Sequence, residues 1–188
     1  MANVNHSTLS DPYLHEPKGV ATASSGDIYL ANGSGSGAWR QAHSHVDAYL
    51  AFDATTPAYA HSATTSFTVI NPTLATTTAS GFTATNSPNA RLTYTGTQSL
   101  SSNIHITIST NQSTGTNKDV EWQIYKNGSL LTGSHVIRTI SSGAWGNVSL
   151  LGNSTLATND YLEIYSKISS AGTVNYASIF WTVKGLPA

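Results

Sequence analysis

The sequence predicts an all-β protein in which short antiparallel strands form a sandwich, a jelly roll or a barrel. Short segments rich in β-branched and aromatic residues recur from about residue 62 onward, and turn residues separate them. Several of these segments alternate apolar and polar residues, as half-buried strands do. No long window carries the apolar stripe of a helix. Regularly spaced strands of this kind are typical of all-β architectures.

The expected strands can be read in chain order. Ile104, Ile106 and Ile108 alternate with polar residues, which places three apolar side chains on one face. A later strand ends at Asn127-Gly128, a strong signal for a two-residue hairpin turn. We predict about eight to ten strands in total. Eight are defined directly: Ser66–Ile70, Ala90–Thr95, Asn103–Thr110, Val120–Tyr125, Ser134–Ile140, Gly146–Leu150, Tyr161–Ile168 and Val174–Val183.

The composition excludes several classes of function. Only 9% of the 188 residues are charged, the formal net charge is −1, and 26 Ser and 26 Thr cover much of the surface instead. The near-neutral balance argues against nucleic acid or an anionic membrane as a partner. The lack of cysteine excludes disulfides, thiol catalysis and cysteine-ligated metal sites. No apolar run approaches the roughly 20 residues of a membrane span, and the first residues do not resemble a secretory signal.

Residues 1–60 differ from the remainder of the chain. Glycine and serine dominate residues 24–37, and a stretch of this kind cannot bury enough apolar surface to fold alone. Spaced apolar and charged residues nevertheless suggest an arm that lies along another surface; a plain solvated terminus is the alternative. We predict an anchoring arm and linker over residues 1–60 and the β domain over residues 61–188. The candidate anchors are Tyr13, Leu14, Glu16, Lys18, Tyr29 and Trp39.

The last strand carries bulky apolar residues at both odd and even positions. Strict alternation would place Tyr176 and Phe180 on one face and Trp181 on the other. A strand buried on one side only would show polar residues on the other side. The pattern therefore predicts that another subunit covers the outer face. Tyr176, Phe180 and Trp181 are the candidate interface residues, although scattered surface aromatics are also normal in a β-sandwich.

The best candidate for metal chemistry is the segment His43-Ser44-His45-Val46-Asp47. Alternate residues of an extended chain point the same way, so His43 and His45 can share a metal ion. Two ligands are too few, but three copies around a threefold axis would supply six. The alternative is a pair of solvated histidines. We assign no metal and no other cofactor to the chain.

Motifs for catalysis are missing from the sequence. It has no Gly-x-Ser-x-Gly elbow, and its glycine-rich stretch lacks the lysine of a phosphate loop. Asp119 and Glu121 share a strand face, as any i, i+2 pair does, and Lys118 and Lys126 are expected to neutralise them. His105 and His135 are interpreted as surface histidines. We therefore expect no enzyme activity and name no catalytic residue.

Several motifs resemble a known family. They are Arg91-Leu92-Thr93-Tyr94-Thr95-Gly96, the run from Trp122 to Ser129, Asn159-Asp160-Tyr161-Leu162-Glu163, and the closing run from Phe180 to Leu186. Together they resemble the jelly roll of the complement-globular-head/tumour-necrosis-factor family. The resemblance implies a jelly-roll domain over residues 61–188 and a homotrimer with the aromatic final strand near its axis.

In this chain the jelly-roll motifs include Tyr125-Lys126-Asn127-Gly128 and end in Gly185-Leu186. In this form they look most like phage virion proteins. The run His15–Val20, followed by Gly33–Trp39, is similar to the arms of tailed-phage structural proteins. The resemblance thus implies a trimeric capsid decoration (cement) or head-fibre protein on the virion surface. Its arm would dock on the major capsid protein or another virion protein. The alternative is a tail-fibre or receptor-binding module that recognises a host surface glycan or protein.

Overall fold

The computed structural model describes residues 23, 27–31, 37–50, 58–113 and 115–188. The chain divides into two units, Met1–Ala42 and His43–Ala188. The first unit contains a hairpin of strands β1 (Asp27–Ala31) and β2 (Gly37–Gln41). Tyr29 lies opposite Trp39 in this hairpin, and the two rings meet edge to face with centroids 5.5 Å apart. The other four predicted anchors, Tyr13, Leu14, Glu16 and Lys18, lie outside the described residues.

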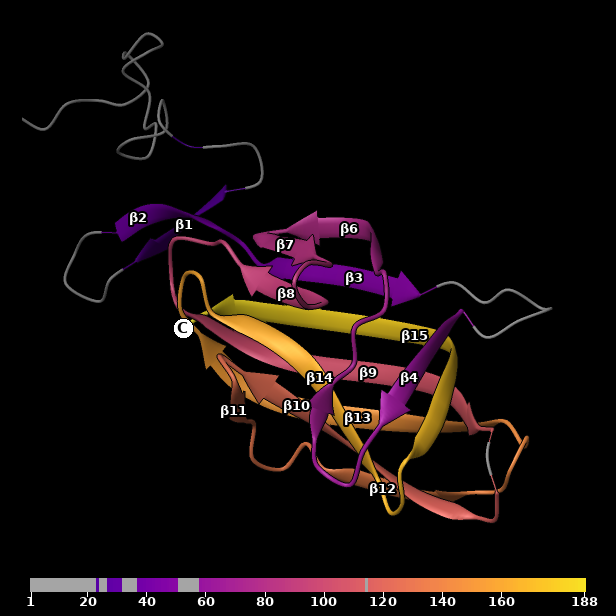
Figure 1. Ribbon diagram of the computed structural model, residues 1–188. Coiled ribbons are helices and arrows are strands. Elements are labelled where there is room, and N and C mark those ends of the chain that lie inside the picture. The colour runs from indigo at the N-terminus through magenta and orange to yellow at the C-terminus, as the bar shows by residue number, and fades with distance from the viewer. Residues whose placement is uncertain (1–22, 24–26, 32–36, 51–57, 114) are drawn as a thin grey trace, which may run out of the picture. The chain divides into compact units, whose positions relative to one another are not determined.

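The second unit consists of two antiparallel sheets that pack face to face (Figure 1). The six-stranded sheet has the order β13 (Gly146–Leu156), β9 (Leu100–Gln112), β15 (Gly172–Pro187), β3 (Ser44–Leu50), β6 (Ala75–Ser80), with β4 (Tyr59–Ala63) also paired to β15. The seven-stranded sheet has the order β11 (Ser129–Leu130), β10 (Lys118–Lys126), β14 (Tyr161–Ile168), β8 (Arg91–Tyr94), β7 (Phe82–Thr85), with β12 (Val136–Ile140) paired to β10 and β5 (Thr68–Val69) paired to β14. Among the described residues there is no helix, and hence none that could cross a bilayer.

The strand order is that of a jelly roll. Strands β3, β9, β13 and β15 belong to one sheet, and strands β8, β10, β12 and β14 belong to the other. Their spatial orders are β13-β9-β15-β3 and β12-β10-β14-β8. The chain therefore crosses from sheet to sheet at every step along these eight strands except between β10 and β12. Two four-stranded layers connected in this way form a double-sheet jelly roll, and the predicted fold class is confirmed.

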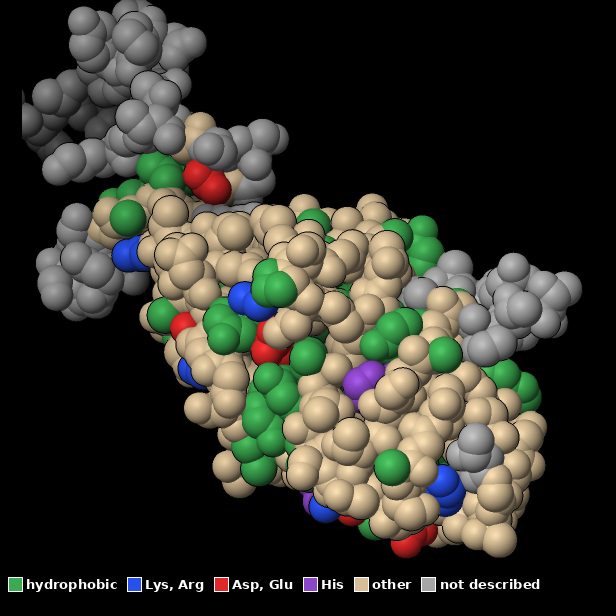
Figure 2. Space-filling model, in the orientation of Figure 1, with side chains coloured by type: hydrophobic (Ala, Val, Ile, Leu, Met, Phe, Trp, Pro, Cys, Tyr) green, Lys and Arg blue, Asp and Glu red, His purple; other side chains and the backbone are tan. Residues whose placement is uncertain are grey.

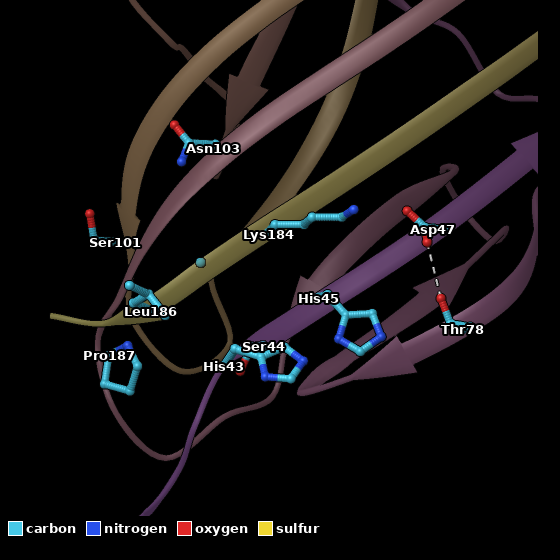
Figure 3. Close-up of a pocket in the computed structure, with 11 residues that line it drawn as sticks. His43, Ser44, His45, Asp47, Thr78, Ser101, Asn103, Lys184, Leu186 and Pro187 are labelled. Carbon is cyan, nitrogen blue, oxygen red and sulfur yellow. Dashed lines mark hydrogen bonds between the residues drawn. The ribbon is translucent and has the colours of Figure 1, made fainter. Parts of the chain in front are cut away.

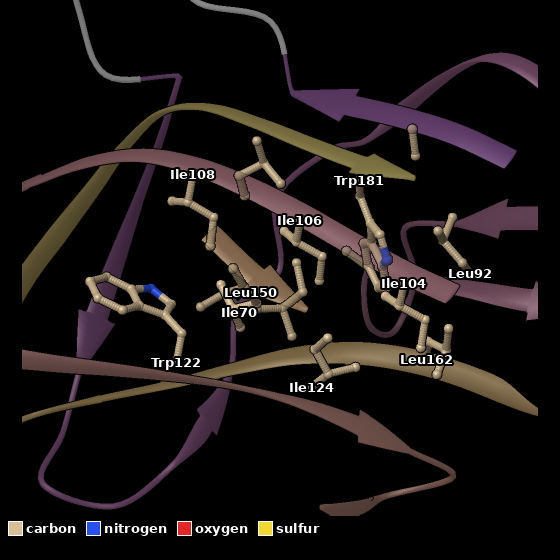
Figure 4. Packing of buried hydrophobic residues seen from close by; sticks show 14 of the residues in the cluster. Ile70, Leu92, Ile104, Ile106, Ile108, Trp122, Ile124, Leu150, Leu162 and Trp181 are labelled. Atoms are coloured by element: carbon tan, nitrogen blue, oxygen red, sulfur yellow. The ribbon is translucent and has the colours of Figure 1, made fainter. Parts of the chain in front are cut away.

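The core lies between the two sheets (Figure 4). Ile104, Ile106 and Ile108 project from β9, and Trp122 and Ile124 project from β10 to meet them. All five side chains are buried, and each contributes roughly 1.5–3 kcal/mol or more relative to an exposed position. The alternation read from the sequence on these two strands is thus the alternation of core and outer face.

The eight predicted strands are all present, with shifted ends. The segment 66–70 shortens to β5, and β9, β13 and β15 extend beyond their predicted bounds. The Asn127-Gly128 turn is confirmed: both residues have positive φ, 51° and 75°, and Lys126 pairs with Ser129 across it.

The sequence predicts a boundary at residue 60, whereas the contacts within the structure divide the chain before His43. Strand β3 pairs with β15, and β4 pairs with the other half of the same strand. Within β3 the buried residues are the small ones, Ser44, Val46 and Ala48, whereas His45, Asp47 and Tyr49 are partly exposed. Small inward and polar outward residues give a weak strand signal, which is why the sequence alone assigns this segment to the linker.

The expectation of two apolar faces on the last strand is also corrected. A β-bulge between Tyr176 and Ser178 shifts the register of β15 against β9. Tyr176 therefore points inward together with Ile179 and Trp181, and the three side chains are at most 1% exposed. Only Phe180 remains as a large apolar residue on the outer face of this part of the strand.

Asp160 fastens the turn between β10 and β11 to the start of β14. Its carboxylate accepts hydrogen bonds from the Asn127 side chain at 2.6 Å, from the Ala157 amide at 2.9 Å and from Lys126 Nζ at 3.3 Å. Burial raises the pKa of Asp160, but the hydrogen bonds from Asn127, Ala157 and Lys126 outweigh burial, and the net pKa is lowered from 3.8. The folded state therefore favours the ionised carboxylate.

We expect Asp160→Asn to destabilise the protein near neutral pH by on the order of 1 kcal/mol, because it removes a charged acceptor from this cluster. A lowered pKa in the folded state gives stability that is present above the unfolded pKa and is lost as pH falls through the folded pKa. The difference in urea unfolding between variant and unaltered protein should therefore shrink below about pH 4. Asp119→Asn is the control for loss of one negative charge. An unchanged difference at about pH 7 and about pH 3 would contradict this account.

Candidate functional site

The outer face of the six-stranded sheet is the candidate site, and cross-strand pairing sets its layout. Lys184 on β15 lies between His45 on β3 and Asn103 on β9. One step along the strands, Thr182 lies between Asp47 and His105. A further step brings Phe180 opposite Tyr49. Basic, acidic and aromatic side chains thus follow one another in rows across β3, β15 and β9.

A groove occupies the end of this face where β3 begins and β15 ends (Figure 3). Its volume is about 920 Å³, within the range of small-ligand sites. Asp47, Lys184 and Asn103 project from three neighbouring strands on the side of the sheet that carries the groove. The lining residues are His43, Ser44, His45, Asp47, Thr78, Ser101, Asn103, Lys184, Gly185, Leu186 and Pro187.

Hydrogen bonds and a ring contact hold the polar side chains of the groove in place. Asp47 accepts hydrogen bonds from the Thr182 hydroxyl at 2.9 Å and from the Thr78 hydroxyl at 3.1 Å, so one carboxylate links β15, β3 and β6. The rings of His43 and His45 stack with centroids 5.1 Å apart. The Nδ1 atom of His45 is buried and has no hydrogen-bond partner. Lys184 is exposed beside these rings, so the groove contains one carboxylate, one ammonium and two imidazoles.

The structure brings His43 and His45 together, as their spacing predicts. No third His, Asp or Glu completes a metal site with them among the described residues. A metal ion held by one chain alone is therefore not supported there. The version with three copies around an axis stays a prediction.

The remainder of the outer face is polar but uncharged. On the four strands β13, β9, β15 and β3, Asp47 and Lys184 are the only residues of the Asp, Glu, Lys or Arg type. Large apolar side chains are nevertheless exposed there: Phe180 is 48% exposed, and Leu151 and Leu186 are 64% exposed.

The three predicted interface residues lie in different environments, two in the core and one on the surface. Tyr176 and Trp181 are core residues of the single chain, so they have no surface to offer a second subunit. Tyr176 instead joins the sheets, because its hydroxyl accepts a hydrogen bond from Trp122 Nε1 at 3.1 Å and donates to Ser166 Oγ at 3.2 Å. Phe180 alone among the three is exposed. The prediction of a subunit interface on β15 therefore rests on Phe180.

Sequence reasoning missed Tyr49, Asp47 and Lys184 as members of this face. The signal was present in the alternation of His45, Asp47 and Tyr49, which places all three on one side of a strand. Nothing in the sequence, however, shows that β3 lies beside the end of β15, because 135 residues separate the paired Asp47 and Thr182.

The acidic pair Asp119 and Glu121 lies on the other sheet with partners other than those expected. Glu121 contacts Lys167 Nζ at 3.0 Å and His135 Nε2 at 2.7 Å, and Asp119 accepts a hydrogen bond from the Thr139 hydroxyl at 2.5 Å. Of the two expected partners, Lys126 pairs with Asp160, and Lys118 donates to the backbone carbonyls of residues 170 and 171. His105 and His135 are exposed, as predicted.

Comparison with known proteins gives a likeness of fold. No protein-family model and no curated protein matches the sequence. Eiger, a TNF from S. frugiperda, is 8% identical over 77% of this chain and 94% of its own, with a TM-score of 0.46. Murine APRIL at pH 5.0 is 14% identical over 77% and 99%, with a TM-score of 0.48. The PRD1 vertex protein P5 is 14% identical over 77% and 97%, with a TM-score of 0.44. Likenesses at this level carry no argument about function, and the jelly-roll assignment rests on the strand order.

The threefold metal hypothesis predicts about one transition-metal ion per three chains in purified protein, held by His43 and His45. Because imidazole binds metal only when neutral, metal content should fall below about pH 6. Elemental analysis of the unaltered protein and of the His43→Ala/His45→Ala double variant checks this, with His105→Ala as the control histidine. Less than about 0.1 ion per three chains in the unaltered protein would return both residues to an ordinary surface role.

Proposed function

We propose that the chain is a non-enzymatic structural protein of a virion, of the capsid decoration (cement) or head-fibre type. In this proposal three copies assemble through the outer face of the six-stranded sheet. The first unit docks on the major capsid protein or another virion protein. The observation that carries the proposal is the exposure of Phe180 opposite Tyr49 on a wide face that has almost no charge.

Assembly is favoured when the free energy gained by burying apolar side chains exceeds the cost of removing water from polar and charged ones. Covering Ser, Thr and Asn side chains costs little when hydrogen bonds re-form across the interface, whereas covering unpaired charges costs several kcal/mol. The outer face of β13, β9, β15 and β3 presents one carboxylate and one ammonium, both at the groove. Exposed Phe180 and Leu151 supply apolar area to be buried. A face of this composition suits a permanent contact between subunits.

A second exposed aromatic lies at the far end of the same sheet. Trp145 lines a notch of about 390 Å³ with Ser109, Ala177 and Ser178, at the bulge of β15. Apolar surface therefore occurs both beside the groove and at the opposite end of the sheet, which is the distribution that a broad subunit contact requires.

We expect Phe180→Asp to convert the assembled protein to monomers, because it places a charge within a dry apolar contact. Leu130→Asp is the matched control, since Leu130 is also 48% exposed but lies on β11 of the other sheet. Light scattering after size-exclusion chromatography measures the mass. The unaltered protein and Leu130→Asp should have three times the mass of one chain. A monodisperse monomer for the unaltered protein would refute the assembly.

The docking part of the proposal is supported by the hairpin of the first unit. Isolated two-stranded hairpins are marginally stable in water, so such a unit gains from lying against another surface. Ile28 and Tyr29 are exposed on it, and Tyr29 also contacts Trp39. Tyr29 and Trp39 are two of the anchors predicted from the sequence.

Deletion of residues 1–42 is expected to leave the jelly roll folded, because this cut falls between the two units. The truncated protein should show the circular dichroism of the jelly roll but lose binding to capsids prepared without it. Tyr29→Ala/Trp39→Ala in the full chain is the point-substitution counterpart. Capsid occupancy equal to that of the unaltered protein would show that the anchor lies elsewhere.

A receptor-binding module of a tail fibre remains the second candidate. The observation that favours it is the aromatic outer face of the seven-stranded sheet, where the rings of Tyr125 and Tyr165 stack. Copy number separates the two roles, because a decoration protein covers the capsid in far more copies than a fibre tip provides. Quantitative mass spectrometry of purified virions measures it.

A further inference from the structure

The outer face of the seven-stranded sheet differs from that of the six-stranded sheet. Its four main strands, β12, β10, β14 and β8, hold eight residues of the Asp, Glu, Lys or Arg type, against two on the opposite layer. Aromatic rings accompany these charges: Phe67, Tyr125, Tyr161 and Tyr165 are all partly exposed. In Figure 2 hydrophobic side chains gather over β10 and β14, with acidic and basic side chains next to them.

The centre of this face is a pair of stacked tyrosines. Tyr125 on β10 and Tyr165 on β14 lie on adjacent rows of the register, and their rings stack with centroids 3.9 Å apart at an angle of 22°. Tyr161 lies further along β14, with the guanidinium of Arg91 4.4 Å from its ring centroid. On the other side of the pair, Phe67 has Lys167 Nζ 4.9 Å from its ring centroid. The stretch of β14 from Tyr161 to Lys167 spans about 20 Å.

The ionised groups beside the rings are paired within the face. Glu163 is buried, lies 3.4 Å from Arg91 and accepts a hydrogen bond from the Asn89 side chain at 3.0 Å. Glu121 contacts Lys167 and His135 in the same way, at 3.0 Å and 2.7 Å. Two carboxylates are therefore matched by two permanent cations. The centre of the face has no net charge at neutral pH.

The hydroxyl of Tyr165 is directed by a hydrogen bond to a carboxylate of the same face. Tyr165 donates a hydrogen bond to Glu163 Oε2 at 3.4 Å, and burial, followed by the Glu163 charge, raises the pKa of Tyr165. Its hydroxyl thus stays protonated, with its oxygen lone pairs left to accept. Gln123 lies opposite Tyr165 in the register but is buried, with 8% of its surface exposed.

We propose that this face, centred on the Tyr125–Tyr165 pair, binds a neutral saccharide. The C–H side of a sugar ring packs on the parts of the aromatic rings that stay exposed, and its hydroxyls exchange hydrogen bonds with tyrosine hydroxyls and the Arg91 guanidinium. A neutral polyhydroxylated ligand requires no net charge opposite it. This matches the face, because Arg91 is paired with Glu163 and Lys167 is paired with Glu121. A protein partner burying about 800 Å² on this side would have to desolvate these ion pairs.

The inference does not rest on the proposed assembly, because the rings belong to the opposite layer of the sandwich. It gives the receptor-binding alternative a location and a class of ligand. It also predicts that the free Phe180→Asp monomer keeps the site.

The first test uses an array of immobilised neutral oligosaccharides containing glucose, galactose or mannose, with sialylated and sulfated counterparts as charged comparators. The best neutral oligosaccharide is then titrated in solution against full-length protein, where affinity per site does not depend on the number of subunits. We expect binding to neutral members, and a loss of about tenfold or more in affinity for Tyr125→Ala and for Tyr165→Ala.

Two further variants keep the result interpretable. Tyr165→Phe retains the ring and removes the hydroxyl, so it should fold and show a smaller loss than Tyr165→Ala. Trp145→Ala removes an exposed aromatic in the loop before β13, beside the six-stranded sheet, and should bind as the unaltered protein does. Circular dichroism checks the fold of each variant.

Three outcomes would overturn the proposal. The first is the absence of binding to any neutral oligosaccharide, or binding to charged members only. The second is binding that survives both alanine substitutions or that is lost in Trp145→Ala instead. The third is capture of a protein partner through Tyr125 with no saccharide bound. Light scattering on the same samples reports assembly separately, so failure of the saccharide site and failure of the trimer are distinguished.

Discussion

The pairing of β15 along the middle of the six-stranded sheet is the constraint on which the remainder of the structure depends. One edge of this strand pairs with β9 from Val174 to Pro187, and the other edge pairs with β4 and then with β3. Buried Ile179, Trp181 and Val183 lie on its inner side. Since β3 and β4 precede the other main strands in the chain, the last strand closes the sheet by joining its earliest parts. Bringing together strands that are far apart in the sequence costs chain entropy, and the apolar surface buried by β15 offsets this cost.

The bulge at Tyr176 determines which side chains of β15 face the core and which face outward. One extra residue turns Tyr176 into the core, where its hydroxyl bonds to Trp122 and Ser166 of the opposite sheet. The same shift leaves Phe180 outward beside Tyr49. A buried hydroxyl without partners would cost about 1–3 kcal/mol, so this small network also favours the bulged register over a regular one. The register thus determines which side chains of β15 enter the core and which lie on the outer face.

The two outer faces have distinct physical characters. The face of β13, β9, β15 and β3 is broad, hydroxylated and nearly uncharged, and covering its exposed Phe180 and Leu151 would remove apolar surface from water. The face of β10 and β14 has fixed rings and charges that already satisfy one another, such as Arg91 with Glu163 and Lys167 with Glu121. The first face suits a permanent subunit contact, and the second suits a small neutral ligand. The two proposals use opposite layers of the sandwich, so they do not conflict.

By itself the sequence determined the all-β class, seven of the eight jelly-roll strands and the Asn127-Gly128 turn, because these depend on local alternation and local turn chemistry. Strand β3 is the exception, since its alternation is weak and its partner β15 lies at the other end of the chain. The alternation of Ile104, Ile106 and Ile108 likewise identified core residues correctly. The exposed ring of Phe180, the groove at His43 and His45, and the stack of Tyr125 on Tyr165 were decided by the tertiary structure alone. A bulge moves a whole set of side chains to the other face without a clear local signal, and cross-strand neighbours are set by pairings between residues far apart in the chain. Asp47 and Thr182, 135 positions apart, meet only because β15 returns to lie beside β3.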